Sequence, residues 1–170
     1  MTRVEQICDQ WQDVRNGLIK EVELIPAAQF GFRAAPETRS VLELVHHIIE
    51  AERLLVGEIC RENTNFQRGF PAMIGDFAPH VKEAETKDAV LDLLRASLDE
   101  TKAKACQFGD ENLGQMMIRF DGKQVPKIGQ LSFNIAHEMY HRGQLTVYER
   151  LLGIEPALTQ YIKKAMGTSQ

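Results

Sequence analysis

The sequence has 170 residues, a length typical of one domain, and its 44% of hydrophobic residues can form a buried core. Its net charge of −4 and the lack of a long apolar run argue against a nucleic-acid partner and against a membrane partner. A polar N-terminus unlike a signal peptide, together with three widely spaced cysteines, predicts one cytoplasmic domain over residues 1–170 without a disulfide framework.

Two amphipathic helices are predicted in the first third of the chain. Apolar residues recur at spacings of three and four over residues 4–25, and Pro26 ends this stripe. Ser40 is a typical N-cap residue, and Glu43 three positions later completes a capping box. The second helix should extend from there to about residue 60.

The rest of the chain predicts two more helices and long connections. Residues 61–85 contain two prolines and indicate a loop with one short turn. A third helix covers residues 86–108, and a fourth spans about residues 130–152. Between them, residues 116–126 could form a hairpin that is too small to change the fold class. The expected fold is therefore all-α, a four-helix bundle with long inter-helix connections.

The fourth predicted helix carries a polar stripe along the middle of its apolar face. On a helical wheel, His141 lies about 40° from His137, so two imidazoles one turn apart can hold one ion. Burying such groups unpaired would cost about 1–3 kcal/mol each, which favours a site over a plain core. The stripe consists of Gln130, Asn134, His137, His141 and Gln144. The apolar residues expected on the same side are Phe133, Tyr140, Leu145, Tyr148, Leu151 and Leu152.

The second predicted helix offers a third imidazole. His47 lies at the border of its apolar face, whereas His46 points about 100° away and is expected at the surface. His80 follows a proline in a loop and is also expected at the surface. Bundles build metal centres from side chains on facing helices, so we predict a divalent ion on His47, His137 and His141. Zinc, nickel, copper and iron all suit imidazole, and zinc or nickel is expected.

The string HEMYH also contains the H-E-x-x-H motif of zinc proteases. One protease class continues with a glycine and a third histidine, where this sequence has Gln144 and Val147. Another class takes a glutamate from farther downstream, but no acidic residue follows Glu155. We therefore interpret the match as accidental. Glu138 is then left for a hydrogen bond or an exposed charge, although its position on the wheel permits a role as a base.

Residues 30–156 resemble the DinB-like superfamily, which includes the YfiT-type metal proteins. The motifs that carry this resemblance are FRAAP, SVLELVHH, HEMYHRGQ and RLLG. The resemblance implies a four-helix bundle with a divalent ion on His47, His137 and His141. It also implies a homodimer, which could pair through residual apolar surface on the first and third predicted helices. Some members of the superfamily are metal-dependent thiol S-transferases or thiol-dependent isomerases.

Two kinds of function follow from these observations. The first is an enzyme in which a metal ion with an open coordination position promotes ionisation of a thiol or of water. On the resemblance, we expect transfer of a low-molecular-weight thiol to a small electrophile, with metal-dependent hydrolysis as the alternative. The candidate catalytic residues are Glu138, Tyr140 and Gln144. The second is a non-catalytic, metal-binding stress-response protein in which the ion holds the bundle together.

Overall fold

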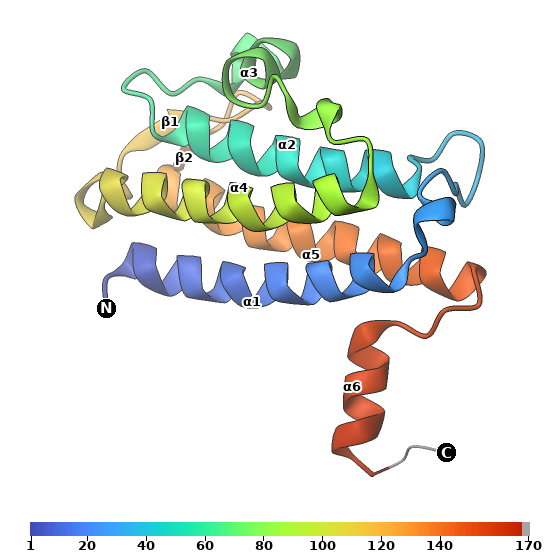
Figure 1. Cartoon of the computed structure of the whole chain (residues 1–170). Coiled ribbons are helices and arrows are strands. Elements are labelled where there is room, and N and C mark those ends of the chain that lie inside the picture. The colour runs from blue at the N-terminus through green and yellow to red at the C-terminus, as the bar shows by residue number, and fades with distance from the viewer. Residues whose placement is uncertain (168–170) are drawn as a thin grey trace.

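Four long helices form the body of the protein in the computed structural model, which describes residues 1–167 (Figure 1). They are α1 (Arg3–Leu24), α2 (Val41–Ile59), α4 (Lys87–Phe108) and α5 (Lys127–Leu151). α4 and α5 each pack against both α1 and α2, so α1 lies diagonally opposite α2. The expected all-α four-helix bundle is confirmed. The predicted domain of residues 1–170 includes residues 168–170, which lie outside the described residues.

The helix ends follow the local signals in the sequence. The Glu43 backbone amide donates to Ser40 Oγ at 3.2 Å, and the Ser40 amide donates to Glu43 Oε2 at 2.8 Å, which completes the predicted capping box. Gly109 follows α4 with φ of 77°, a conformation that favours glycine. The predicted hairpin is present as β1 (Met116–Ile118) paired antiparallel with β2 (Gln124–Pro126), and it leads directly into α5.

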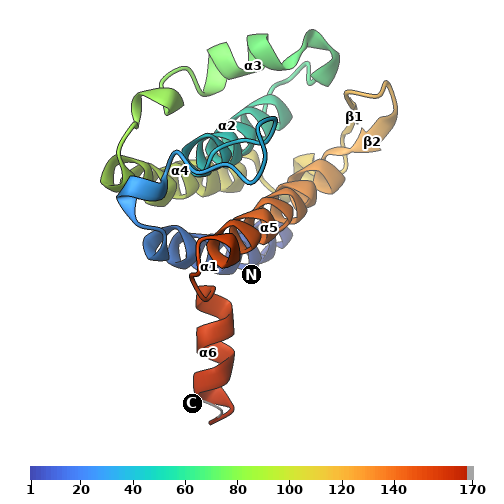
Figure 2. The same cartoon turned by 90° about the vertical axis from the view of Figure 1, so that its right-hand side faces the viewer.

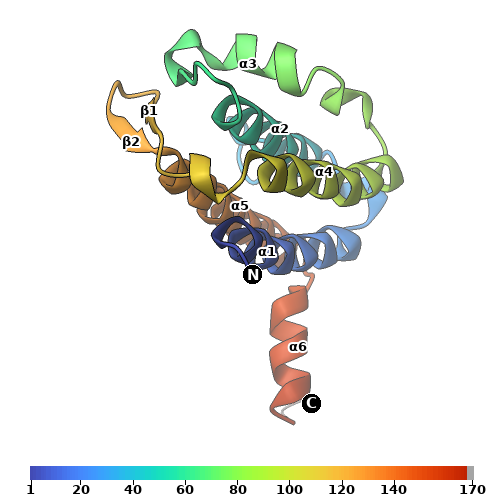
Figure 3. The ribbon, with the colours of Figure 1, turned by 90° about the vertical axis from the view of Figure 1, so that its left-hand side faces the viewer.

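The connection between α2 and α4 is more regular than a loop with one turn. It contains two 3-10 turns, η2 (Phe66–Arg68) and η3 (Val81–Glu83), on either side of the helix α3 (Phe70–Phe77). These elements pack on the outer side of α2, as Figures 2 and 3 show. The predicted surface position of His46 is therefore wrong. His46 is buried, and its Nε2 atom lies 2.9 Å from the carbonyl oxygen of Ala84.

A helix that the sequence analysis did not predict, α6 (Ala157–Ala165), follows α5 and projects from the end of the bundle (Figure 1). None of its residues is buried. The Ala157 amide at its first turn donates to a carboxylate oxygen of Glu21, which ties it to α1. Two further 3-10 turns, η1 (Ala27–Gln29) and η4 (Asp110–Asn112), complete the elements of the described chain.

The exposed apolar surface lies on other helices than predicted. Among residues 1–167, the large exposed apolar side chains lie mainly on α3, α5, α6 and the hairpin, and α1 and α4 have none. Phe133, Tyr140 and Leu151, which the wheel placed on the buried side of α5, are exposed. α5 packs mainly against α1 and α2, so its buried side is narrower than the wheel suggested. None of the described helices combines the length and apolarity needed to cross a membrane.

A polar layer crosses the middle of the bundle and divides its apolar core in two. One apolar cluster includes Trp11 of α1, and the other includes Leu18, about two turns farther along α1 and past Arg15. Each of the four long helices contributes one side chain to the layer, in which Arg15 is the cation. The four residues are Arg15, Glu52, Ser97 and Glu138, all of them buried. The layer ties all four long helices together through hydrogen bonds.

Candidate metal centre

The three predicted histidine ligands come together where α2 packs against α5. His47 belongs to α2, and His137 and His141 lie one turn apart on α5. Their ligand nitrogens all lie within 4.8 Å of one another. The Nε2 atoms of His137 and His141 are 3.1 Å apart. Two nitrogens bound to one tetrahedral zinc ion would be about 3.3 Å apart, so these three residues could hold a metal ion.

Burial keeps these imidazoles neutral. Desolvation is the main cause that lowers the pKa of His47 to about 3 and that of His137 to about 4. It also lowers the pKa of His141, and the positive charge of Arg39 lowers the pKa of all three histidines further. A neutral imidazole has a free lone pair, so the three side chains fit a divalent ion at neutral pH.

Gln144 orients one of the three rings. Its Oε1 atom lies 2.9 Å from Nδ1 of His141. Because a carbonyl oxygen only accepts hydrogen bonds, Nδ1 carries the proton, and the lone pair of His141 lies on Nε2, facing His137. Tyr140 stands beside the same ring, with its centroid 5.1 Å away, and its side chain is largely exposed.

Glu138 faces away from the histidines although it lies between them in sequence. Its Oε1 atom accepts a hydrogen bond from Arg15 Nε at 2.7 Å, and its Oε2 atom accepts one from Trp11 Nε1 at 2.7 Å. The carboxylate thus belongs to the polar layer of the core and does not line the cavity next to the histidines. This position favours the hydrogen-bonding role that the sequence left open for Glu138.

A cavity of about 490 Å³ adjoins His47 and His137. Its walls come from α2, η2, α3, α5, the hairpin turn and the segment before α2. Most of the lining side chains are apolar, and they include Leu54, Leu55, Phe66, Phe70, Ile74, Phe120 and Phe133. The polar ones besides the two histidines are Arg39, Glu50 and Gln130. The volume and the apolar walls with a few polar groups are typical of small-molecule sites.

Sequence reasoning missed Arg39 and Glu50 as site residues. Glu50 lies one helical turn after His47, and that spacing could have indicated it. Arg39 directly precedes the N-cap of α2 in an irregular segment, where no periodicity predicts the direction of a side chain. His80, as expected, lies at the surface, where its Nδ1 atom is 2.7 Å from Glu83 Oε1.

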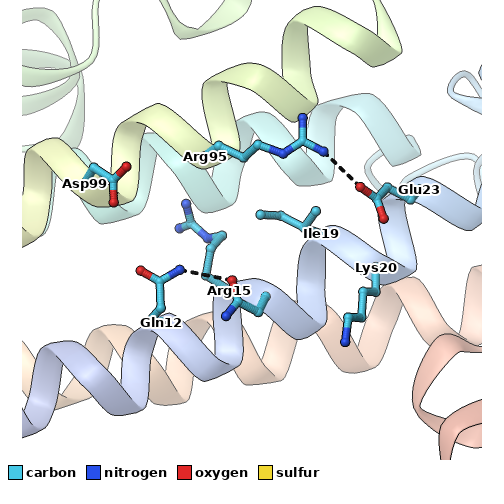
Figure 4. A pocket seen from close by; sticks show the side chains of 8 residues that line it. Gln12, Arg15, Ile19, Lys20, Glu23, Arg95 and Asp99 are labelled. Atoms are coloured by element: carbon cyan, nitrogen blue, oxygen red, sulfur yellow. Dashed lines mark hydrogen bonds and ion pairs between the residues drawn. The ribbon is translucent and has the colours of Figure 1, made fainter.

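A second hollow, of about 420 Å³, lies between α1 and α4 on the opposite edge of the bundle (Figure 4). Charged side chains of both signs line it, and Arg95 and Glu23 form an ion pair of 2.9 Å there. It contains none of the three histidines. The cavity beside His47 and His137 is therefore the better candidate for a reaction site.

The fold and the site define a helical-bundle protein with a candidate three-histidine metal centre. The chain belongs to the DinB family, whose family model matches residues 1–170. The resemblance noted in the sequence is thereby confirmed.

Known proteins resemble the chain over most of its length. The uncharacterized protein YjoA from Bacillus subtilis is 26% identical over 156 residues, which cover 90% of this chain and 93% of YjoA. The crystal structure of YjoA superposes with a TM-score of 0.66 over 87% of this chain and 92% of that one, at 24% identity.

Two other solved structures have the same fold at lower identity. YfiT from Bacillus subtilis, described as a probable metal-dependent hydrolase with an unusual four-helix bundle topology, has a TM-score of 0.68 at 16% identity. The match covers 90% of this chain and 89% of YfiT. A mycothiol-dependent maleylpyruvate isomerase has a TM-score of 0.64 at 16% identity, over 84% of this chain and 60% of the isomerase. At these identities the likeness concerns the fold alone.

Proposed function

We propose that this protein is a metal-dependent enzyme that transfers a low-molecular-weight thiol to a small electrophile. The observation that carries the proposal is the place of the histidines. His47 and His137 form part of the wall of a cavity of about 490 Å³, so an ion there would be accessible to a small molecule. Catalytic metal sites keep such an open position, whereas structural sites are closed by protein ligands.

The three histidines would hold the ion, and zinc or nickel suits this ligand set. When bound, a divalent ion stabilises the anionic form of a thiol or of water. A free thiol has a pKa of about 8.5, against about 15.7 for water, so a thiol needs less stabilisation to ionise at neutral pH. This difference favours thiol transfer over hydrolysis. The similar folds of a mycothiol-dependent isomerase and of a protein described as a hydrolase keep both reactions in view.

The chain's own residues prepare the site for this chemistry. Gln144 fixes the proton on Nδ1 of His141, which leaves Nε2 free to bind the ion. The aromatic side chains around the cavity would hold the apolar part of the substrate and exclude water from it. Tyr140, exposed beside His141, could contact a substrate that projects from the site.

The non-catalytic stress-response alternative has less support. In that case the ion would hold the bundle together, yet the polar layer around Arg15 already links all four long helices without an ion. The three histidines connect α2 with α5 only. The protein therefore has no evident need for an ion to fold.

Consumption of a thiol in the presence of 1-chloro-2,4-dinitrobenzene tests the proposal. Wild-type protein loaded with zinc or nickel should accelerate the reaction, and His141→Ala at matched total metal should not. His46→Ala is the matched control, since it removes a neighbouring imidazole that faces the opposite way. Equal rates for wild type and His141→Ala, across several biological thiols, would overturn the transferase proposal.

We further propose that the protein is a single cytoplasmic domain that forms a homodimer. Exposed apolar side chains along α5 and α6 support pairing through these two helices. They are Met139, Val147 and Leu151 on α5, with Leu158, Tyr161 and Ile162 on α6. Apolar surface of this kind is commonly covered in assemblies.

A further inference from the structure

We propose that the substrate of this site carries an anionic group, a carboxylate or a phosphate, which Arg39 binds beside the histidines while an apolar, aromatic body occupies the cavity. This inference deepens the proposed function and rests on it for the reaction that the bound molecule undergoes. The recognition of the anion depends on the chain's own residues alone.

The backbone of Arg39 is anchored at the edge of the site. The Tyr148 hydroxyl donates a hydrogen bond of 2.9 Å to the Arg39 carbonyl oxygen, which fixes the backbone of this residue against α5. Arg39 lines the cavity together with His47 and His137. Arg39 also lines a separate neighbouring hollow, whose other lining residues include Gln144 and Val147. Arg39 therefore lies between this hollow and the cavity beside the histidines.

Arg39 is exposed, and its guanidinium lacks a protein partner in the part of the chain that the structure describes. Within residues 1–167, no hydrogen bond or ion pair engages it. By contrast, Arg33 in the same segment pairs with Glu43 at 2.5 Å, and Arg142 on α5 pairs with Glu21 at 2.9 Å. An arginine offers five donors in a planar fork that matches a carboxylate or a phosphate. An unpaired guanidinium on the wall of a cavity is therefore suited to bind an anionic ligand.

Within residues 1–167 no carboxylate forms an ion pair with Arg39, although Glu37 lines the neighbouring hollow with it. Glu50 is the only acidic residue among those that line the cavity, and Lys82 Nζ lies 3.7 Å from its Oε1 atom. Imidazoles that bind a metal ion do so in their neutral form, so a divalent ion on the three histidines would add positive charge to that of Arg39. An anion should therefore bind in this cavity more tightly than an uncharged molecule of the same shape.

The aromatic side chains in the cavity wall indicate the chemistry of the uncharged part of the ligand. Phe66 is buried in the wall, whereas Phe70, Phe120 and Phe133 line the cavity and are 44–58% exposed. Aromatic rings stack on one another and bury large apolar areas. A ligand with a flat apolar body would cover these three rings, which the chain itself leaves open.

Calorimetric binding of a matched set of probes tests the proposal. The probes are 4-phenylbutanoate, the uncharged 4-phenylbutanamide and 3-phenylpropyl phosphate. We expect both metal-free and zinc-loaded wild type to bind 4-phenylbutanoate at least about tenfold more tightly than the amide. The phosphate probe distinguishes the two anions, since the tighter of the two identifies the preferred headgroup.

Substitutions of Arg39 test whether this residue causes the preference for the carboxylate over the amide. Arg39→Gln should reduce the carboxylate-over-amide ratio in the metal-free protein to about threefold or less without changing amide binding. Arg39→Lys keeps the charge and should retain part of the ratio. Arg95→Gln, which removes a similar charge from α4 on the opposite edge of the bundle, should change nothing. A metal-free wild type with no preference, or an Arg39→Gln variant that keeps the full ratio, would overturn the proposal.

The same measurements separate this inference from the proposed reaction. Binding to the metal-free protein requires neither turnover nor an ion. If thiol transfer fails while the ratio depends on Arg39, the anion site stands and the transferase proposal falls. If thiol transfer proceeds but the protein does not prefer the carboxylate over the amide, the transferase proposal stands and the anion site falls. Far-UV circular dichroism of Arg39→Gln and Arg39→Lys checks that both variants are folded.

Discussion

Arg15 and Glu138 form an ion pair of 2.7 Å in the interior of the bundle, where both side chains are almost fully buried. Glu138 is the glutamate of the H-E-x-x-H string, in which a zinc protease uses this residue as its general base. Here its carboxylate is engaged by Arg15 and Trp11 and faces away from the histidines. The chain therefore contains the H-E-x-x-H string without its usual chemistry, because the Glu138 side chain points away from the histidines.

We accordingly predict that the protein has no peptidase activity. Zinc-loaded protein incubated with unfolded casein should leave the casein intact, as judged by gel electrophoresis. A thermolysin sample under the same conditions serves as the positive control. Cleavage that is lost in Glu138→Gln would restore the protease interpretation.

Removing Arg15 should destabilise the fold strongly. Arg15→Met leaves the carboxylates of Glu52 and Glu138 buried without their cation, which typically costs about 3–5 kcal/mol. Urea denaturation followed by circular dichroism measures the loss. Arg95→Met, which breaks an ion pair whose side chains are about half exposed, should cost less than about 1 kcal/mol. Similar losses for the two variants would show that the polar layer contributes little to stability.

The four long helices and the three-histidine site could be predicted from local patterns in the sequence. Periodicity and capping residues located the four long helices, and spacing on two helices selected His47, His137 and His141. The covering of α2 by α3 and η3 depends on contacts between distant segments, so the burial of His46 could not be predicted from the wheel of one helix. Arg15 continues the apolar stripe of α1 between Trp11 and Leu18, but its partners lie on other helices.

The four histidines near the site should separate into two classes. Alanine at His47, His137 or His141 should lower the zinc affinity by at least about 100-fold, measured by competition with a chromogenic chelator. His46→Ala should keep the metal but lose about 0.5–1.5 kcal/mol of stability, because it removes the hydrogen bond to the half-buried Ala84 carbonyl. Loss of metal in His46→Ala with full binding in His47→Ala would contradict the ligand assignment.

The buried carboxyl of Glu149 should make stability fall as pH rises. Neither of its oxygens has a hydrogen-bond partner in residues 1–167. Burial, with a smaller contribution from Glu21, raises the pKa of Glu149 from 4.5 to about 8. Between these values the unfolded chain has lost a proton that the folded protein keeps, so ionisation favours unfolding. The stability due to this group is therefore present below about pH 4.5 and is lost progressively up to about pH 8.

Glu149→Gln tests this prediction, since a glutamine cannot ionise. The variant should match wild type near pH 5 and be more stable by roughly 1–3 kcal/mol near pH 9. Urea midpoints across this range provide the measurement. Glu62→Gln, at an exposed position, should follow the wild-type profile. A Glu149→Gln profile parallel to that of wild type would show that the buried carboxyl does not control the slope.

The last prediction concerns the dimer and the surface that forms it. Met139, Val147 and Leu151 recur along α5 at spacings of four and eight, so they share one exposed side of the helix. If two copies pair there, Val147→Glu places a charge in an apolar interface and should convert the dimer to a monomer. Multi-angle light scattering at micromolar concentration measures the mass. Ala96→Glu adds the same charge to the exposed face of α4, where the sequence had suggested pairing, and should leave the dimer intact. A wild-type monomer, or a dimer that Ala96→Glu disrupts and Val147→Glu does not, would contradict pairing through α5.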